Sequence, residues 1–471
     1  MSDIKIYNTL SRTIEDFIPI KKGVTGIYSC GPTVYHYAHI GNLRAYIYAD
    51  ILRRTLVYDG LEVKHLINIT DVGHLTDDGN DGEDKLEKGA IREGKTAYEV
   101  AEFYTKAFLD DLEKLNIPQK EYIFPRATDH INEQIEIIKE LEEKGYTYKI
   151  NDGIYFDTSK FKSYGKMAKL DIEGLKSGAR VTENKEKRNI TDFALWKFSK
   201  ADEKRQMEWN SPWGKGFPGW HIECSAMSIK YLGKHFDIHT GGIDHIPVHH
   251  TNEIAQSESA TGEKFVNYWM HINFLNEKDG KMSKSTGDFL RLQTLIDKKI
   301  NPLSFRYYIL TTHYRKEVNF SFESLNAADE AYKKLLNFCI GKNNNLPAGR
   351  HDGNVSVKYK KDFNDVIFYD LNTAEAIAVI WKMLKDDQIK DEDKYSTLME
   401  MDSVLGLDLA NAKKEEIVLT EKIKELIHKR EVARNEKNWA LSDEIRNEIR
   451  NLGFDVKDTE NGQEIVLNGN L

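Results

Sequence analysis

The chain has 471 residues, of which 40% are hydrophobic and 30% are charged, and its formal net charge is −9. This length allows two to four domains with a sizeable core, and the acidic balance means that any nucleic acid must be bound by a local basic surface. Three cysteines are too few for a disulfide framework, and the lack of an apolar signal core or of any run of about 18 apolar residues predicts a cytoplasmic protein.

The first clear pattern along the chain is a strand, a helix and a second strand. VTGIYSC (24–30) predicts a buried strand, apolar residues recur at helical spacing within residues 42–58, and VKHLINIT (63–70) predicts the second strand. This unit predicts a parallel crossover, whose first loop at residues 31–41 lies where parallel sheets bind ligands. No GxGxxG occurs there, so the sequence does not support a dinucleotide site.

The middle of the chain mixes regular elements with irregular segments. Residues 75–95 are acidic and glycine-rich and predict a mobile surface loop, and residues 160–190 predict an irregular insertion. Regular elements are expected at residues 96–116 (helix), 128–145 (helix), 146–157 (hairpin), 235–244 (strand and loop), 246–262 (helix) and 271–275 (strand).

After about residue 320 the pattern becomes helical. Residues 322–410 predict several helices, and Cys339 is expected to pack within one of them. Residues 421–451 predict two short amphipathic helices with a break at Asn438, and Leu441 is placed on the buried stripe of the second. The alternating charges of the first helix are typical of a solvated face with i,i+4 pairs, and a small hairpin is expected at residues 453–467.

A possible metal site combines two distant cysteines with one helix face. Cys30 ends the first strand and Cys224 lies in GWHIECSAM, while His249 and Glu253 are four residues apart and therefore share a helix face. Two thiolates, an imidazole and a carboxylate are donors that zinc accepts, in preference to magnesium or calcium. The ordinary alternative is a pair of buried cysteines and a simple helix pair, which spacing alone favours because no CxxC occurs.

Other histidines crowd the same part of the sequence. His250 is a competing ligand, but on a helix it points about 100° away from His249. His235, His239 and His245 are expected to be hydrogen-bonding loop or core residues.

A possible phosphate site lies at the start of the first helix. His36 and His39 precede Gly41, where a helix amino terminus offers N–H donors and a positive dipole, and glycine allows close approach of a nucleotide. Lys281 and Lys284 of KMSKS can compensate the charge of a triphosphate. The alternatives are structural histidines at a polar helix start and a solvated basic loop, but the two motifs together are much more specific.

Taken together, these motifs resemble those of the class I aminoacyl-tRNA synthetases. HIGN stands for the family's HIGH signature, with Asn42 in its last position, and KMSKS matches in full. GWHIECSAM, DFALWK and HHTNEIAQ are similar to segments of the subgroup that is specific for cysteine, and the resemblance covers essentially the whole chain.

The resemblance implies roles for individual residues. It implies zinc ligands at Cys30, Cys224, His249 and Glu253, nucleotide contacts at His36, His39, Gly41, Asn42, Lys281 and Lys284, contacts to the amino acid and adenylate at Thr70, Trp220 and Asp244, and anticodon contacts at Arg434 and Asp443. It also implies one zinc ion per chain, magnesium with ATP, and a monomer that uses L-cysteine, ATP and tRNA(Cys).

The implied architecture is an α/β fold with a Rossmann-like parallel sheet, an inserted connective segment, a helical region and a small anticodon-binding domain. The expected boundaries are 1–124 and 201–320 (the two halves of the catalytic domain), 125–200 (insertion, too short and too polar for an editing domain), 321–415 (helical bundle) and 416–471 (anticodon-binding domain).

Two rival functions share some of these motifs. A ligase that joins cysteine to an amino sugar would keep every motif through KMSKS, but it would have little use for the long helical region that follows. A non-catalytic module that binds zinc and RNA is disfavoured because both histidines and both lysines are present.

Overall fold

The computed structural model describes residues 3–73, 85–170, 186–200, 205–277, 290–340, 342, 353–413, 420–459 and 462–467. The chain divides into two compact units, Met1–Asn411 and Ala412–Leu471. The finer boundaries that the sequence suggests inside the first unit remain predictions.

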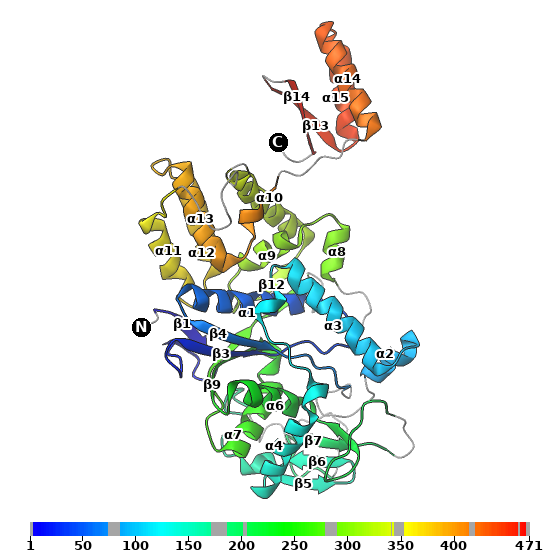
Figure 1. The fold of residues 1–471 in the computed structure, drawn as a ribbon, viewed down its shortest axis with the longest axis vertical. Coiled ribbons are helices and arrows are strands. Elements are labelled where there is room, and N and C mark those ends of the chain that lie inside the picture. Colours follow the sequence, from blue (N-terminus) through cyan, green and yellow to red (C-terminus); the bar gives the residue numbers. More distant parts are fainter. Residues whose placement is uncertain are drawn as a thin grey trace. The chain divides into compact units, whose positions relative to one another are not determined.

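The centre of the first unit is a four-stranded parallel sheet with the strand order β10-β9-β3-β4 (Figure 1). β3 (Val24–Ser29) pairs with β4 (Glu62–Ile67) on one side and with β9 (Phe236–Gly242) on the other, and β9 pairs with β10 (Val266–Ile272). The predicted α/β fold with a parallel sheet is confirmed. The strand expected at residues 271–275 begins earlier, because the buried run from Val266 extends it along β9.

Helices cover both faces of this sheet. α1 (Ile40–Tyr58) connects β3 to β4 on one face, and α6 (Trp220–Leu232) and α7 (His249–Thr261) lie on the other (Figure 1). Because crossovers between parallel strands are right-handed, the chain leaves β3 and β9 toward opposite faces. The carboxyl ends of these neighbouring strands are therefore the topological switch point, where such sheets place their ligands.

The inserted segment between β4 and β9 builds a second, antiparallel layer. Its four strands are ordered β5-β6-β7-β8, and its first two form the hairpin that the sequence predicts. Residues 85–93 are helical, so that part of the loop predicted at 75–95 is wrong, whereas residues 74–84 lie outside the described residues. The elements are α2 (Lys85–Glu93), α3 (Ala97–Lys114), α4 (Ile131–Glu143), β5 (Thr147–Ile150), β6 (Gly153–Phe156), β7 (Phe193–Phe198) and β8 (Gly216–Pro218).

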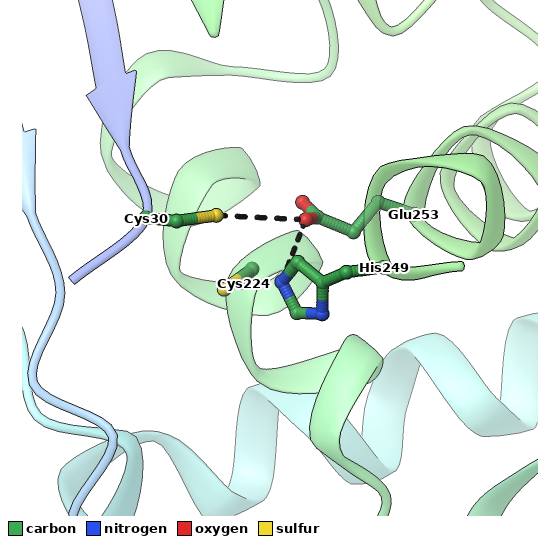
Figure 2. A group of neighbouring side chains, drawn as sticks. All are labelled: Cys30, Cys224, His249 and Glu253. Carbon is green, nitrogen blue, oxygen red and sulfur yellow. Dashed lines mark hydrogen bonds and ion pairs between the residues drawn. The ribbon is translucent and has the colours of Figure 1, made fainter. Parts of the chain in front are cut away.

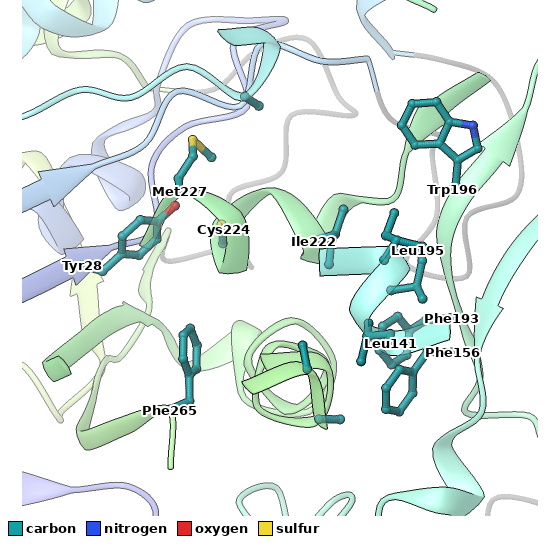
Figure 3. Close-up of a cluster of buried hydrophobic side chains, with 14 of the residues drawn as sticks. Tyr28, Leu141, Phe156, Phe193, Leu195, Trp196, Ile222, Cys224, Met227 and Phe265 are labelled. Atoms are coloured by element: carbon teal, nitrogen blue, oxygen red, sulfur yellow. The ribbon is translucent and has the colours of Figure 1, made fainter. Parts of the chain in front are cut away.

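One apolar core joins the insertion to the parallel sheet. Phe156 and Phe193 of the antiparallel sheet pack with Ile222 of α6, and Met227 and Tyr28 continue the cluster to β3 (Figure 3). Cys224 is a member of the same core and is 1% exposed. Since apolar packing of this kind fixes side-chain positions, the core holds α6 and its cysteine against the end of β3.

The rest of the first unit adds two strand pairs and a helical region. The predicted helices between residues 322 and 410 are confirmed, and Cys339 is fully buried within α10, as expected. The elements are β1 (Lys5–Asn8), β2 (Thr13–Asp16), β11 (Leu275–Glu277), α8 (Leu292–Asp297), α9 (Pro302–Leu310), β12 (Val318–Phe320), α10 (Phe322–Cys339), α11 (Val357–Ile367), α12 (Thr373–Leu384) and α13 (Asp391–Leu405). Within the described ranges, no helix is both long and apolar enough to cross a lipid bilayer.

The second unit is a helical hairpin packed on a β-hairpin. It contains α14 (Glu421–Asn435), α15 (Trp439–Asn451), β13 (Phe454–Thr459) and β14 (Gly462–Leu467). Asn438 accepts a hydrogen bond from the Leu441 N–H and so caps α15, which confirms the predicted break. Leu441 is 41% exposed, so its predicted burial is wrong: in the first turn of α15 it lies beyond the small core of Leu426, Ile445, Ile449 and Val456.

Candidate active site and metal centre

A cavity of about 260 Å³ opens at the carboxyl ends of β3 and β9. Its wall includes residues 240–242 at the end of β9 and residues 272–275, which begin at the last residue of β10. The wall also contains seven of the site residues that the family resemblance implies: Cys30, His36, His39, Gly41, Asn42, Trp220 and Asp244.

The four predicted metal ligands meet beside this cavity. Figure 2 shows Cys30 after β3, Cys224 in α6, and His249 and Glu253 in α7 pointing toward one another. Their donor atoms all lie within 4.8 Å of one another. Nε2 of His249 lies 3.0 Å from Oε1 of Glu253, and Sγ of Cys30 lies 4.0 Å from the same oxygen.

This geometry and chemistry fit a zinc ion. Tetrahedral zinc with bonds of about 2.0–2.3 Å holds its donor atoms about 3.3–3.8 Å apart, so a small contraction of the cluster suffices. Two sulfurs, one imidazole and one carboxylate are ordinary zinc donors. Cys224, His249 and Glu253 are at most 2% exposed, and groups buried this deeply need hydrogen-bond, ionic or metal partners.

Electrostatics inside the cluster favour the anionic forms of Cys224 and Glu253, whereas burial and the neighbouring Cys224 raise the pKa of the Cys30 thiol. The interaction with Cys30 lowers the pKa of Cys224 to about 6, against the effect of burial. Burial raises the pKa of a carboxyl group, but His239 and His249 outweigh it and hold the pKa of Glu253 at about 2. Burial also opposes protonation of His249, whose pKa is nevertheless raised to about 10 by Glu253 and Cys224. A divalent cation would bind the Cys224 thiolate and the Glu253 carboxylate directly and would displace the protons of Cys30 and His249.

Two further histidines, His239 and His250, reach the same cluster. His250 was expected to point away from the cluster, and this expectation is wrong. Its Nε2 lies 3.1 Å from Sγ of Cys30, because Cys30 at the end of β3 is within reach of both His250 and Glu253 of α7. Nε2 of His239 lies 3.0 Å from Oε2 of Glu253. Cys30, His239, His250 and Glu253 form an alternative set of four donors within the same 4.8 Å limit.

Outer residues orient these histidines. Nδ1 of His249 lies 3.0 Å from Nδ1 of His221, and Nδ1 of His250 lies 2.7 Å from Nε2 of His271. Such contacts fix ring orientation around metal sites. His221 and His271 were not singled out from the sequence, although His221 shares a helix with Cys224 and His271 lies near the end of β10, beside β9.

The histidine at the start of α1 is fixed by a reciprocal cap. Nδ1 of His39 accepts a hydrogen bond from the Asn42 N–H at 3.0 Å, and Oδ1 of Asn42 accepts one from the His39 N–H at 3.3 Å. Because Nδ1 is an acceptor, neutral His39 carries its proton on Nε2. A Cβ on Gly41 would lie 2.9 Å from Nδ1 of His39, so only glycine fits beside this ring.

His36 is held by aromatic contacts rather than by the helix start. Its ring stacks on Tyr104 of α3 with a centroid distance of 5.7 Å and an interplanar angle of 15°. Both residues line the cavity. The structure thus places His36 at the rim of the cavity, on the side that faces α3.

Of the three residues expected near the amino acid and adenylate, Trp220 and Asp244 line the cavity and Thr70 bonds to its wall. Trp220 opens α6, and its ring centroid lies 4.3 Å from that of His249, beside the metal cluster. Asp244 lies in the wall after β9. Thr70 hydrogen-bonds through its backbone to Pro32 and Val34 of the wall, at 3.1 and 3.2 Å, and its hydroxyl accepts from Asn68.

The remaining predicted residues lie elsewhere. Lys281 and Lys284 lie outside the described residues. Arg434 and Asp443 belong to the second unit, where Arg434 pairs with Asp458 at 3.0 Å and its guanidinium lies 5.7 Å from the ring centroid of Trp439. Trp439 is 57% exposed and does not belong to the core of the second unit.

Comparisons with known proteins show the family to which the chain belongs. A family described as "tRNA synthetases class I (C) catalytic domain" matches residues 16–330, and one described as "Cysteinyl-tRNA ligase anticodon binding domain" matches residues 418–465. The chain is 49% identical over 463 residues to "Cysteine--tRNA ligase 1" of Burkholderia lata, which covers 98% of this chain and 96% of the relative. It is 45% identical over 482 residues to "Cysteine--tRNA ligase" of Treponema denticola, with 97% and 98% covered.

A solved structure shows the same fold at low sequence identity. Methionyl-tRNA synthetase of Mycobacterium tuberculosis in complex with methionyl-adenylate superposes with a TM-score of 0.52 and 15% identity, over 82% of this chain and 90% of that chain. At this identity the similarity concerns the fold alone.

Proposed function

This chain belongs to the cysteine-specific class I aminoacyl-tRNA synthetases, and on that premise we propose that its residues activate L-cysteine with ATP and transfer it to the 3′ end of tRNA(Cys). The single observation that carries the assignment of the substrate is the meeting of four metal-binding side chains from distant segments beside the nucleotide motif. The cavity thus offers a sulfur site and a phosphate site next to each other.

The metal site selects the amino acid in this proposal. Cys30, Cys224, His249 and Glu253 would hold zinc, with His239 and His250 supporting them through Glu253 and Cys30. When bound, zinc supplies a soft Lewis acid that favours a thiolate over an alcohol. Shape alone discriminates small side chains by only about 10–200-fold, so a sulfur-selective site makes an editing domain unnecessary.

The first step is formation of cysteinyl-adenylate. The carboxylate of cysteine attacks the α-phosphorus of ATP, and pyrophosphate leaves in line with the attacking oxygen. The amino terminus of α1 and the Nε2–H of His39 donate to phosphate oxygens whose charge grows in the transition state. Gly41 lets the nucleotide lie against the helix, and Lys281 and Lys284 are assigned to the same charge by their KMSKS motif.

The second step transfers the cysteinyl group. A terminal ribose hydroxyl of the tRNA attacks the carbonyl carbon of the adenylate, and AMP leaves. No side-chain nucleophile is required, so Thr70, Trp220 and Asp244 act by holding the amino acid and the adenylate in place. Arg434 and Asp443 of the second unit are assigned to the anticodon, on which the exposed Trp439 could provide a stacking surface.

The proposal includes one zinc ion per chain, magnesium bound with ATP, a monomeric enzyme and a cytoplasmic location. The ligase that joins cysteine to an amino sugar is not favoured, because the chain carries a domain that matches the anticodon-binding family.

A cysteine-dependent ATP–pyrophosphate exchange assay combined with metal analysis tests the proposal. Exchange that depends on cysteine, exceeds exchange with serine at equal concentration and accompanies bound zinc supports it. Exchange that is equal for the two amino acids, or that persists unchanged after zinc removal, contradicts the role of the metal site. Transfer of labelled cysteine to tRNA but not to an amino sugar separates the two ligase functions.

A further inference from the structure

A fully buried arginine lies two residues after the last position of the nucleotide motif. Arg44 belongs to the first turns of α1 and is 0% exposed. A buried guanidinium is costly unless its N–H groups are satisfied, so its partners show what it is built to hold.

The partners of Arg44 are backbone carbonyl groups from two loops. Nη1 donates to the carbonyl oxygens of Asn273 at 2.7 Å and Phe274 at 2.6 Å. Nη2 donates to those of His313 at 3.2 Å and Lys316 at 2.6 Å, with that of Tyr314 more distant at 3.5 Å. One side chain of α1 therefore fastens two segments that lie more than 200 positions away in the sequence.

The segment that Arg44 holds is a wall of the catalytic cavity. Asn273 and Phe274 line the cavity together with Gly41 and Asn42 of α1. The carbonyl oxygen of Leu275 lies 3.5 Å from the position of a Cβ on Gly41, so the wall runs close against the helix start. A small displacement of this wall would change the space beside the phosphate-binding end of α1.

Backbone hydrogen bonds continue the same frame. The Asn273 N–H donates to Tyr314 at 2.9 Å, and the Val318 N–H donates to Phe274 at 3.0 Å. On the other side of the helix start, the Ile40 N–H donates to the carbonyl oxygen of Leu290 at 2.9 Å. The start of α1 is thus attached to chain segments that precede and follow the KMSKS motif.

We propose that Arg44 is a positioning residue for adenylate formation, because its guanidinium fixes the Asn273–Phe274 wall of the cavity against the nucleotide-binding start of α1. This inference rests on the proposed nucleotide site and adds a residue that touches neither substrate. A planar guanidinium can bond to several carbonyl groups in fixed directions, whereas a lysine ammonium has three donors at a single point.

Arg306 provides a matched control. It is also 0% exposed and also donates to backbone carbonyls, those of Leu405 and Leu115, at 2.8 and 2.9 Å. Its further partner is Asp50, and it is not among the residues that line the cavity. Lysine at either position removes a buried guanidinium, but only the change at Arg44 loosens the cavity wall.

The test compares Arg44→Lys with Arg306→Lys in the full chain, using cysteine-dependent ATP–pyrophosphate exchange, bound zinc and thermal unfolding. For Arg44→Lys we expect kcat/KM for ATP to fall by about tenfold to hundredfold, with the KM for cysteine and the zinc content unchanged. For Arg306→Lys we expect a lower unfolding temperature but wild-type kinetics per folded molecule. Unchanged ATP kinetics for Arg44→Lys, or an equal loss in both variants, overturns the proposal.

A second measurement decides the matter if Arg44→Lys folds poorly. In Arg44→Ala, millimolar guanidinium ion is expected to restore exchange by occupying the vacated site, with no restoration in Arg306→Ala. A lack of restoration in the folded Arg44→Ala protein overturns the proposal. If the wild-type chain shows no cysteine-dependent exchange at all, the proposed function fails, and not the role of Arg44 within it.

Discussion

The metal cluster and the start of α1 border one cavity, but they are constructed in different ways. The proposed phosphate-binding end of α1 is local: His39, Gly41 and Asn42 are neighbours in sequence, and His39 and Asn42 hold each other through a capping box. The metal cluster is assembled from Cys30 after one strand, Cys224 in a helix more than 190 positions later, and two residues of a further helix. A local motif depends on a few backbone angles, whereas an assembled cluster depends on the packing of the whole first unit.

This difference predicts how each site fails. Loss of one ligand in the assembled cluster should remove the ion. The three ligands that remain do not complete the four-donor site, and a buried charge without its partner is costly. Loss of a side chain in the local motif should slow one chemical step and leave the other site intact. The variants below test this separation, beginning with the largest expected effect.

Cys224→Ser should remove bound zinc and cysteine activation together, because a hydroxyl is a poor zinc ligand at neutral pH. We expect kcat/KM for cysteine to fall more than about 100-fold, measured by ATP–pyrophosphate exchange, with zinc content measured in parallel. Cys339→Ser is the control, since Cys339 is equally buried but lies in α10. Full activity with retained zinc in Cys224→Ser would refute the metal site.

His39→Asn should separate the two functions of the histidine at the start of α1. Asparagine is a good helix cap, so the unfolding temperature should change little, but the Nε2–H donor to phosphate is lost. We expect kcat for exchange to fall by about 100-fold to 1,000-fold, with zinc content unchanged. A parallel loss of zinc would show that the two sites are coupled after all.

Arg434→Ala should affect only the tRNA step. Removal of a contact to tRNA is expected to raise the KM for tRNA by about tenfold in the aminoacylation assay, while exchange stays at the wild-type level. Lys424→Ala, which removes an exposed charge near the start of the same helix α14, is the matched control. Equal effects of the two changes would indicate a general loss of positive charge rather than a specific contact.

The smallest effect concerns stability below neutral pH. His65 of β4 lies behind the cavity, with Nε2 2.8 Å from Oγ of Ser29, and burial lowers its pKa to about 3. Because the unfolded chain binds the proton near pH 6.5 and the folded chain does not, the stabilising contribution of neutral His65 is present above pH 6.5 and is lost as the pH falls toward 3.

Between pH 7 and pH 5, this contribution should fall by about 2 kcal/mol. His65→Gln should reduce the loss of unfolding free energy in urea titrations at these two pH values, although the variant is less stable at pH 7. An identical pH dependence in the wild-type chain and the variant would mean that His65 does not titrate in this way.

Several elements could be predicted because their signals are local. The 3.6-residue period of α1 and α3, the turn at Asn151–Gly153 and the cap at Asn438 each depend on neighbouring residues, and the structure confirms them. The predicted burial of Leu441 is wrong. Its position fits the helical period of the buried stripe, but the small core of the second unit does not extend to the first turn of α15. Helix α2 was predicted as a loop because its glycine and its charged residues are typical of loops.

The candidate site divides in the same way. The resemblance assigned all four metal ligands by number, and spacing alone supported only the pair His249 and Glu253. Helical spacing placed His250 on another face of α7 than His249. That His250 nevertheless reaches Cys30 depends on where the end of β3 lies against α7. Arg44 was read only as part of a helical pattern, since its partners are backbone carbonyls, which carry no sequence signal.

The sequence by itself determined the class of fold, the position of the nucleotide motif and the residue types available for a metal, because periodicity and short motifs are properties of adjacent residues. Only the tertiary structure decided which sulfur, imidazole and carboxylate groups meet, which histidines support them, and which arginine holds the cavity wall. The physical reason is that these contacts depend on the order of strands in the sheet and on the packing of one core, which bring together residues that are distant along the chain.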